Sequence, residues 1–443
     1  MRTASLRVVS LALALGASAA SAQPRIIDLG EPQLPDGAFG QVIPVDGARP
    51  VGDVGVLRSS RAPVCVHVGE GVTPETARDT LRFAEEALDA LEYRLGLPLP
   101  LGDGTRGGTN DLDVYLRTDG PLSETVPDVV DPAWLWDRAS AFVRVRTTSD
   151  ARALRRHVTE ALVRAAVLGV KADHPPTFVS ALGSTVARWI TGDTPDLASW
   201  RAFQRNVHRS IFARRERTDE ESRGASLFLD HLTRRWDDES HALLKGLLWA
   251  PVQHTPRGSA LFWDEPDLFD VARRVFRDER GGVRSMLLEF AAARSLVGTP
   301  ADAFNLAGGF DESLGTTPVR TLRFSQLPAW VTPTEALEPT GSATVVIDLF
   351  DAPLVRPAMA VWFHGSPWQR WMVRAVRVSN DGRPVAELDS EVITQGEWST
   401  QFDVLDVYRE VRIVILALGD ESYDPDVPAN PNGFFALNVA PVR

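Results

Sequence analysis

Apolar residues recur with a period of about 3.6 over two neighbouring segments of the chain, and this pattern predicts two consecutive buried helices. Ser149 or Asp150 would cap the first helix, which spans residues 151–170. A proline-containing loop at 173–176 leads to a second apolar segment at 178–191. The first segment places these residues on one side: Leu154, Val158, Ala161, Leu162, Ala165 and Gly169.

Before these helices, the pattern predicts short strands and one long helix. The helix spans 74–95, with Pro74 at its start and Gly96 at its end. Strands are predicted at 62–68, 112–116 and 141–145. Further helical segments follow at 200–212 and 225–236.

From about residue 320 the period changes to alternation between apolar and polar positions. Strands are predicted at 322–327, 343–349, 359–363, 371–378 and 411–418. Several short strands without a strong helix are typical of a β-sandwich. The predicted fold class is therefore α+β, with a mainly helical domain at 62–319 and an antiparallel β-sandwich domain at 320–443.

The first 61 residues have a different character. Residues 1–22 contain Arg2 and Arg7, then an apolar run, then Ala20-Ser-Ala22, which is the pattern of a secretory signal peptide. We therefore expect an exported protein, either periplasmic or extracellular. Residues 23–61 are rich in Pro and Gly and predict an extended N-terminal segment, for which a propeptide role is left open.

Composition narrows the classes of partner. The chain has 443 residues and a formal net charge of −12, which disfavours nucleic acid as a partner. After the signal peptide, no stretch reaches the roughly 18 apolar residues needed to cross a bilayer, so we expect no membrane insertion. Cys65 is the only cysteine, and its apolar neighbours predict a buried strand residue.

The region around 95–116 carries a resemblance to a known family. A helix ending in Leu95-Gly96 is followed by a Pro-x-Pro step, by Gly107-Gly108 and by the run from Asp111 to Leu116. Together with the later strand and helix, this order resembles bacterial secreted zinc metalloproteases of the zincin class. The resemblance covers roughly 62–443 and implies a metalloprotease-like domain with a C-terminal β-sandwich module.

In that family the first central helix carries His-Glu-x-x-His, whose histidines hold Zn while the glutamate acts as general base. The best register here places Thr159 and Val163 at the histidine positions and Ser184 at the third ligand position. Glu160 is the remnant of the general base, and we expect it to be inactive because no metal activates a water. The resemblance thus implies a pseudoenzyme that has lost its zinc cofactor.

Other interpretations of this helix remain open. His157 and Glu160 share one helix face and would be the ligands of an unusual zinc site. Arg156 and Arg164 flank Glu160 at i−4 and i+4, so a surface ion pair is a simpler explanation. No Gly-x-Ser-x-Gly motif is present, and Ser184 lies within a predicted helix, which makes it a poor nucleophile.

Two acidic segments are candidate calcium sites. The first comprises Asp420, Asp424 and Asp426 in a loop after the last long strand, where a solvated loop is the simpler interpretation. The second comprises Asp103, Asp111 and Asp113 around the Gly-rich loop, where a turn before a strand is the simpler interpretation.

Three functional hypotheses follow. The first is an inactive secreted pseudopeptidase that acts by binding a peptide or a protein. The second is an active secreted zinc metallopeptidase with an unusual site at His157 and Glu160. The third is a β-sandwich adhesion protein with an inert helical domain.

Overall fold

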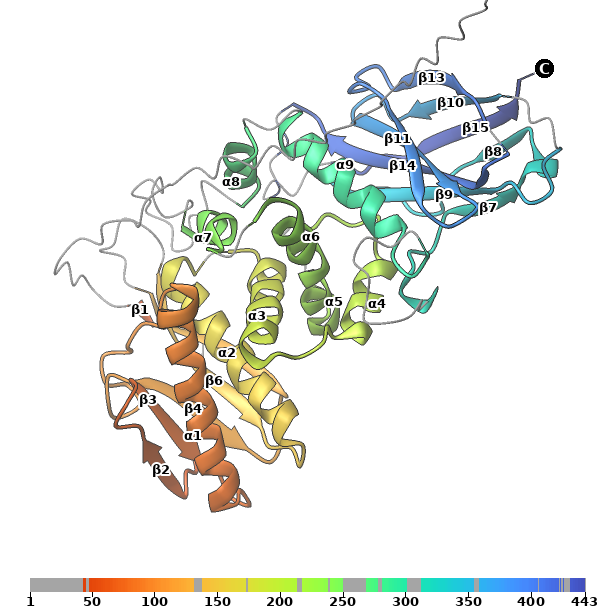
Figure 1. Cartoon of the computed structure of the whole chain (residues 1–443). Helices are drawn as coiled ribbons and strands as arrows, with labels where there is room; N and C mark the ends of the chain where they lie inside the picture. Colours follow the sequence, from red (N-terminus) through yellow and green to blue (C-terminus); the bar gives the residue numbers. More distant parts are fainter. Residues whose placement is uncertain are drawn as a thin grey trace, which may run out of the picture.

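The computed structural model describes residues 43–44, 48–130, 138–172, 174–212, 217–237, 240–249, 268–277, 281–300, 312–353, 358–404, 406–421, 423, 425 and 431–442. These residues form both helices and sheets, which confirms the coarse α+β class. Helices occupy the middle of the molecule, between an N-terminal sheet and a group of C-terminal strands (Figure 1). The predicted signal peptide at 1–22 lies outside the described residues.

A mixed sheet forms the N-terminal end of the described chain. Its strand order is β1-β5-β6-β4-β3-β2, where β3, β4 and β6 are parallel and β5 is antiparallel to β6. The first two strands come from the Pro- and Gly-rich segment. The strands are β1 Ile43–Pro44, β2 Gly55–Arg58, β3 Val64–Val68, β4 Leu112–Arg117, β5 Ser123–Val130 and β6 Ala139–Arg146.

Two helices pack against this sheet, and a third packs on the second of them. Helix α1 (Pro74–Asp89) is capped by Thr73 and continues as a π-helical segment to Leu95, where Gly96 adopts a left-handed conformation. Helix α2 (Ala151–Val170) is capped by Asp150, and α3 (Pro176–Thr191) ends at left-handed Gly192. Because α2 contacts β5, β6, α1 and α3, it is buried on nearly all sides.

Shorter helices connect this part to the C-terminal strands. They are α4 Leu197–Arg205, α5 Asp219–Gly224, α6 Ser226–Trp236, α7 Ala242–Trp249, α8 Leu268–Val275 and α9 Gly282–Ser295. The helix predicted at 200–212 is wrong beyond Arg205. The backbone carbonyls of Val207 and His208 instead accept hydrogen bonds from the Ser342 and Glu338 amides, which pulls the chain out of the helix.

The C-terminal strands form two sheets that share one hydrophobic core. The five-stranded sheet has the order β12-β11-β14-β9-β7, and the four-stranded sheet has the order β13-β10-β15-β8. Neighbouring strands are antiparallel except for β7 and β9. The strands are β7 Arg320–Arg323, β8 Ala329–Val331, β9 Ser342–Asp348, β10 Met359–Gly365, β11 Arg370–Ser379, β12 Pro384–Asp389, β13 Glu397–Phe402, β14 Tyr408–Gly419 and β15 Phe435–Pro441.

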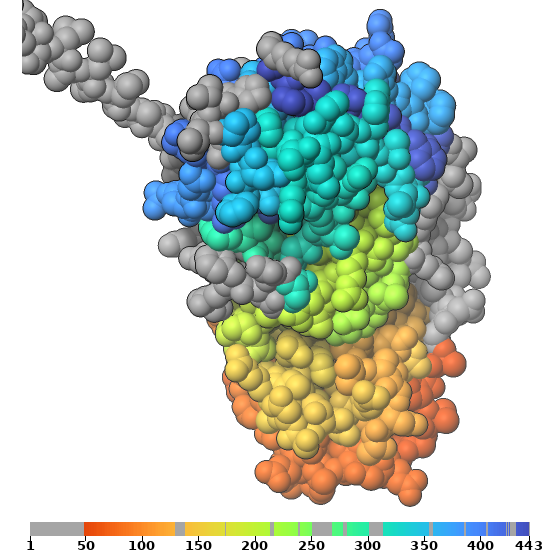
Figure 2. Space-filling view, turned by 90° about the vertical axis from the view of Figure 1, so that its right-hand side faces the viewer, coloured from red at the N-terminus to blue at the C-terminus, as the bar shows by residue number. Residues whose placement is uncertain are grey.

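Helix α9 joins the helical part to the five-stranded sheet. Apolar residues of α9 and the turn after it pack on the outer face of this sheet, in a cluster of Ala291, Ala292, Leu296, Val376, Val378 and Val414. Leu416, Leu418 and Tyr423 in turn belong to the core of the helical part. Figure 2 shows the resulting body, in which the chain is layered from one end to the other in sequence order.

Arg49 holds a cluster of buried carboxylates on the N-terminal sheet. Its guanidinium donates hydrogen bonds to Asp103, Asp113 and Asp128, whose side chains are at most 1 % exposed. His67 Nε2 lies 3.0 Å from Asp113 Oδ1. Burial by itself would raise the pKa of Asp113, but the hydrogen bonds from His67 and Arg49 lower it below its ordinary value.

Gly107 allows this close approach. A Cβ atom at Gly107 would lie 1.6 Å from Asp113 Oδ2 and 2.5 Å from Arg49 Nη1. The Gly-rich loop is therefore part of the wall around the carboxylates. Asp103, Asp111 and Asp113 were candidate calcium ligands. The positive charge beside Asp103 and Asp113 is the side chain of Arg49 from the N-terminal segment. Asp111 instead pairs with Arg58, whose Nε lies 2.8 Å from its carboxylate.

We expect Arg49→Met to destabilise the protein by roughly 3–5 kcal/mol at neutral pH, because buried carboxylates would lose their counter-charge. The free energy of unfolding from urea titration measures the loss. The loss should shrink at pH values where the carboxylates are protonated in the variant. Arg58→Met is the matched control, since Arg58 is exposed and its ion pair contributes less than about 1 kcal/mol. Equal losses in both variants would contradict this role of Arg49.

Candidate functional site

Glu160, the predicted remnant of a general base, lies inside the molecule on α2. It is 2 % exposed, and its Oε1 accepts a hydrogen bond of 2.6 Å from Arg164 Nη2. Arg223 of α5 places its Nε 3.9 Å from the same oxygen. The prediction of an ion pair with Arg164 is confirmed, but its placement on the surface is wrong, because α3 and α5 cover this side of α2.

The network continues to α5. Asp219 Oδ1 lies 3.6 Å from Arg164 Nη2, and Asp219 Oδ2 accepts a hydrogen bond of 2.6 Å from Arg223. Two guanidinium groups and two carboxylates thus alternate between α2 and α5. Glu160 Oε1 already accepts a hydrogen bond from Arg164, so a reacting water at this oxygen would have to compete with that guanidinium.

Gly183 explains why α3 can approach this network. A Cβ atom at Gly183 would lie 2.9 Å from Arg164 Cγ and 3.3 Å from Glu160 Cγ. The next residue, Ser184, is half-buried on α3. The helix crossing therefore brings the segment that contains the predicted third-ligand position next to the predicted base position.

The two positions predicted to replace histidines are filled by side chains that metals do not bind well. Thr159 is buried, and its hydroxyl donates a hydrogen bond of 2.8 Å to the Arg155 carbonyl one turn earlier. Val163 is buried in the apolar core. Among the described residues, no group of three or more His, Cys, Asp or Glu side chains could hold a metal ion.

His157 is the other candidate ligand on α2. It is 4 % exposed, and its Nδ1 has no hydrogen-bond partner among the described residues. Burial lowers the pKa of His157 to about 4, and the positive charges of Arg156, Arg223 and Arg146 add to this effect. A neutral imidazole is a possible metal ligand, but the nearby guanidinium groups oppose the approach of a cation.

The candidate calcium loop after β14 is only partly described. Asp424 and Asp426 lie outside the described residues. The Arg370 guanidinium donates hydrogen bonds to the carbonyls of Gly419 and Asp420, so a cationic side chain already fixes the backbone at the start of this loop.

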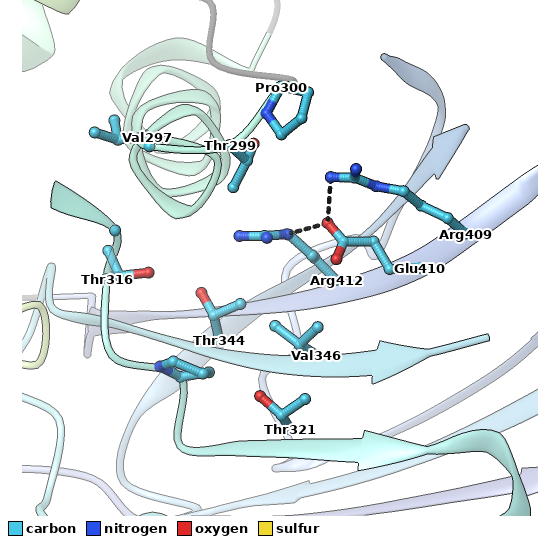
Figure 3. Close-up of a pocket in the computed structure, with 13 residues that line it drawn as sticks. Val297, Thr299, Pro300, Thr316, Thr321, Thr344, Val346, Arg409, Glu410 and Arg412 are labelled. Carbon is cyan, nitrogen blue, oxygen red and sulfur yellow. Dashed lines mark hydrogen bonds and ion pairs between the residues drawn. The ribbon is translucent and has the colours of Figure 1, made fainter. Parts of the chain in front are cut away.

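A cavity of about 470 Å³ lies on the outer face of the five-stranded sheet, beside the end of α9. Its walls come from the turn after α9, the approach to β7 and strands β7, β9 and β14 (Figure 3). Four threonines contribute hydroxyl groups: Thr299, Thr316, Thr321 and Thr344. A volume of this size is within the range of small-ligand sites.

Two guanidinium groups and one carboxylate line the same cavity. Glu410 Oε1 lies 2.8 Å from Arg412 Nε and 3.9 Å from Arg409 Nη2, as Figure 3 shows. Arg412 also donates to the Ser295 carbonyl at the end of α9. Arg409 Nε is buried without a hydrogen-bond partner among the described residues. The side chains of the cavity thus carry a net positive charge on a chain whose overall charge is negative.

The sequence interpretation missed this cavity. Arg409, Glu410 and Arg412 stand at the start of an apolar strand that was predicted to begin at residue 411. Glu410 and Arg412 have a spacing of two and point to the same face of a strand, and this was the available signal, although it does not place Arg409 beside them. The helix end that completes the cavity is more than a hundred residues away in sequence.

No family model matches the chain, and no curated protein matches it. Among solved structures, the chain is similar to the enzymatically active domain of tailspike protein 4 from bacteriophage CBA120. The identity is 9 %, the TM-score is 0.18, and the match covers 26 % of this chain and 18 % of that one. A similarity this low carries no argument about fold or function. No described helix is long and apolar enough to cross a membrane.

We expect His157 to titrate with a midpoint near pH 4, which proton NMR of the histidine ring would measure. Its folded pKa lies below the ordinary value of 6.5, so protons bind preferentially to the unfolded chain. Stability from the neutral ring is complete above pH 6.5 and decreases as the pH falls toward 4. The control is His157→Gln, which should lose this part of the pH dependence and keep that of His231, whose pKa burial also lowers to about 4. A midpoint near 6.5 would show that the ring is hydrated.

Proposed function

We propose that this chain is a secreted, zincin-like pseudopeptidase that has lost catalysis and acts by binding a peptide or a protein. The observation that carries the proposal is the buried ion pair of Glu160 with Arg164. A general base needs access to a metal-bound water, whereas this carboxylate is enclosed by α3, α5 and two guanidinium groups.

The arrangement of elements supports the family part of the proposal. Strand β6 leads directly into α2, and α3 crosses α2 beside Glu160, which is the order that the sequence resemblance implies. We further infer that the two C-terminal sheets form a β-sandwich module. Their shared core and the packing of one outer face on α9 favour this description.

The cavity beside α9 is where we place the bound peptide. A peptide C-terminal carboxylate would meet the side chain of Arg409, which is one-third exposed at the cavity, and the threonine hydroxyls would serve neighbouring backbone groups. Capture of a terminal carboxylate is one of the recurring modes of peptide recognition. The negative charge of Glu410 in the same cavity would disfavour ligands that carry further negative charges.

Metal content and hydrolysis test the loss of catalysis. After dialysis against Zn, we expect elemental mass spectrometry of the purified protein to find no stoichiometric zinc. Glu160→Gln should leave the background rate of peptide hydrolysis unchanged, while lowering stability because Arg164 loses its counter-charge. About one zinc per chain that disappears in His157→Ala, with hydrolysis abolished in Glu160→Gln, would instead establish the active zinc peptidase with a His157 and Glu160 site.

Peptide binding is tested separately. A peptide library with free C-termini should yield ligands that bind the full chain, and their C-terminally amidated forms should bind at least about tenfold more weakly because a charge-assisted hydrogen bond is lost. Arg409→Met should reproduce this loss in isothermal titration. Arg58→Met is the control, since Arg58 is exposed on β2 of the N-terminal sheet, at the other end of the molecule from the cavity (Figure 1). Equal affinity of free and amidated peptides would exclude the cavity as a carboxylate site.

A further inference from the structure

The outer face of the four-stranded sheet carries a row of exposed and half-buried residues that crosses all its strands. In this row Trp362 of β10 lies opposite Ser399 of β13 and Asn438 of β15, and Asn438 lies opposite Trp330 of β8. Trp362 is 40 % exposed and Trp330 is 57 % exposed. We call this row, together with His364 in the next row, the aromatic platform.

His364 extends the platform toward the end of β10. Its ring centroid lies 6.1 Å from that of Trp330, with an angle of 35° between the rings. Its neighbours in register are Ala436 and Glu397, and Glu397 Oε1 lies 3.5 Å from His364 Nδ1. The small side chain of Ala436 leaves the faces of the aromatic rings accessible from above.

The two outer faces of the C-terminal sheets are built differently. On the five-stranded sheet, outward valines such as Val376 and Val414 are buried under α9. On the four-stranded sheet, the outward tryptophans, histidine and serine are exposed and the asparagine is half-buried, in the part of the chain that the structure describes. Exposing two tryptophan side chains to water on one sheet face is unfavourable, and such exposed apolar groups mark an interaction site.

The chemistry of the platform matches a neutral carbohydrate. Sugar rings have a face of C–H groups that packs on an indole, and hydroxyl groups around the edge that need hydrogen-bond partners. Asn438 and Ser399 supply such partners directly beside Trp362. Glu397 lies beside His364 at the edge of the platform, and the groups directly beside Trp362, Asn438 and Ser399, are uncharged, which suits a neutral ligand.

The spacing favours an oligosaccharide over a single sugar. Trp362 and Trp330 are two strands apart, which corresponds to about 10 Å at the usual strand separation. A short chain of sugar rings can span that distance and contact both indoles. We propose that the outer face of the four-stranded sheet binds a neutral oligosaccharide or polysaccharide by stacking on Trp330 and Trp362.

This site is independent of the pseudopeptidase proposal, because it lies on the other sheet from the cavity and from α9. For the hypothesis of a β-sandwich adhesion protein, it specifies the class of ligand, a neutral carbohydrate. Failure of either proposal would leave the other in place, since they involve different residues and different ligands.

Affinity electrophoresis of the full chain through gels that contain soluble neutral polysaccharides tests the proposal, with xylan, mannan and hydroxyethylcellulose as probes. We expect retardation by at least one of them, and Trp330→Ala and Trp362→Ala should each weaken it at least tenfold. Phe350→Ala is the control, since Phe350 is 94 % exposed in the turn after β9. Unchanged melting temperatures would show that the tryptophan variants are folded.

Three results would overturn the proposal. The first is no retardation by any of the neutral polysaccharides, and the second is equal retardation of the tryptophan variants and the unmodified chain. The third is retardation only by an acidic polysaccharide such as alginate, which would assign the recognition to charged groups and not to the indole faces. Quenching or a shift of tryptophan fluorescence that is titratable in the unmodified chain and lost in Trp362→Ala would independently support it.

Discussion

The burial of α2 on nearly all sides is the constraint on which much of the structure depends. From His157 to its end α2 is buried, so the polar side chains of this part depend on their surroundings inside the protein. Thr159 donates to a carbonyl of its own helix, Glu160 pairs with Arg164, and His157 stays neutral. Strand β5 takes part as well, because Ser123 and Thr125 donate hydrogen bonds to the carbonyls of His157 and Ala161. These contacts fix the orientation of α2 between the sheet and α3.

The same constraint bears on the comparison with a metal-binding helix. A catalytic zinc site needs an open coordination position and access for water. In this chain the space beside Glu160 is filled by Arg164 and Arg223 and closed by the approach of α3 at Gly183. Breaking a buried ion pair is costly, so each partner now depends on the other. Histidines introduced at residues 159 and 163 alone would therefore still meet the guanidinium groups of Arg164 and Arg223 beside Glu160.

The parts of the fold that the sequence predicted are those with strong local periodicity. Helices α1, α2 and α3 begin and end near their predicted limits because Pro74, Asp150, Gly96 and Gly192 mark them locally. Strand β5 was missed because Glu124, Pro127 and Asp128 interrupt its apolar pattern. The burial of Glu160 depends on α5, and the position of Arg49 depends on carboxylates 54 to 79 residues away. No local pattern contains such long-range information.

Arg49 also determines how this protein responds to its surroundings. Three buried aspartates would often be neutralised by a dissociable metal ion, whose occupancy varies with its concentration outside the protein. Here the neutralising charge is attached to the backbone, so its effective concentration is set by the length of the intervening chain. Neither a chelator nor dilution can remove this charge, because the arginine is covalently part of the chain. Proteolytic removal of the segment that carries Arg49 would have the same effect as the loss of a bound metal ion. Residues 48–54 are therefore an integral part of the sheet that they cross.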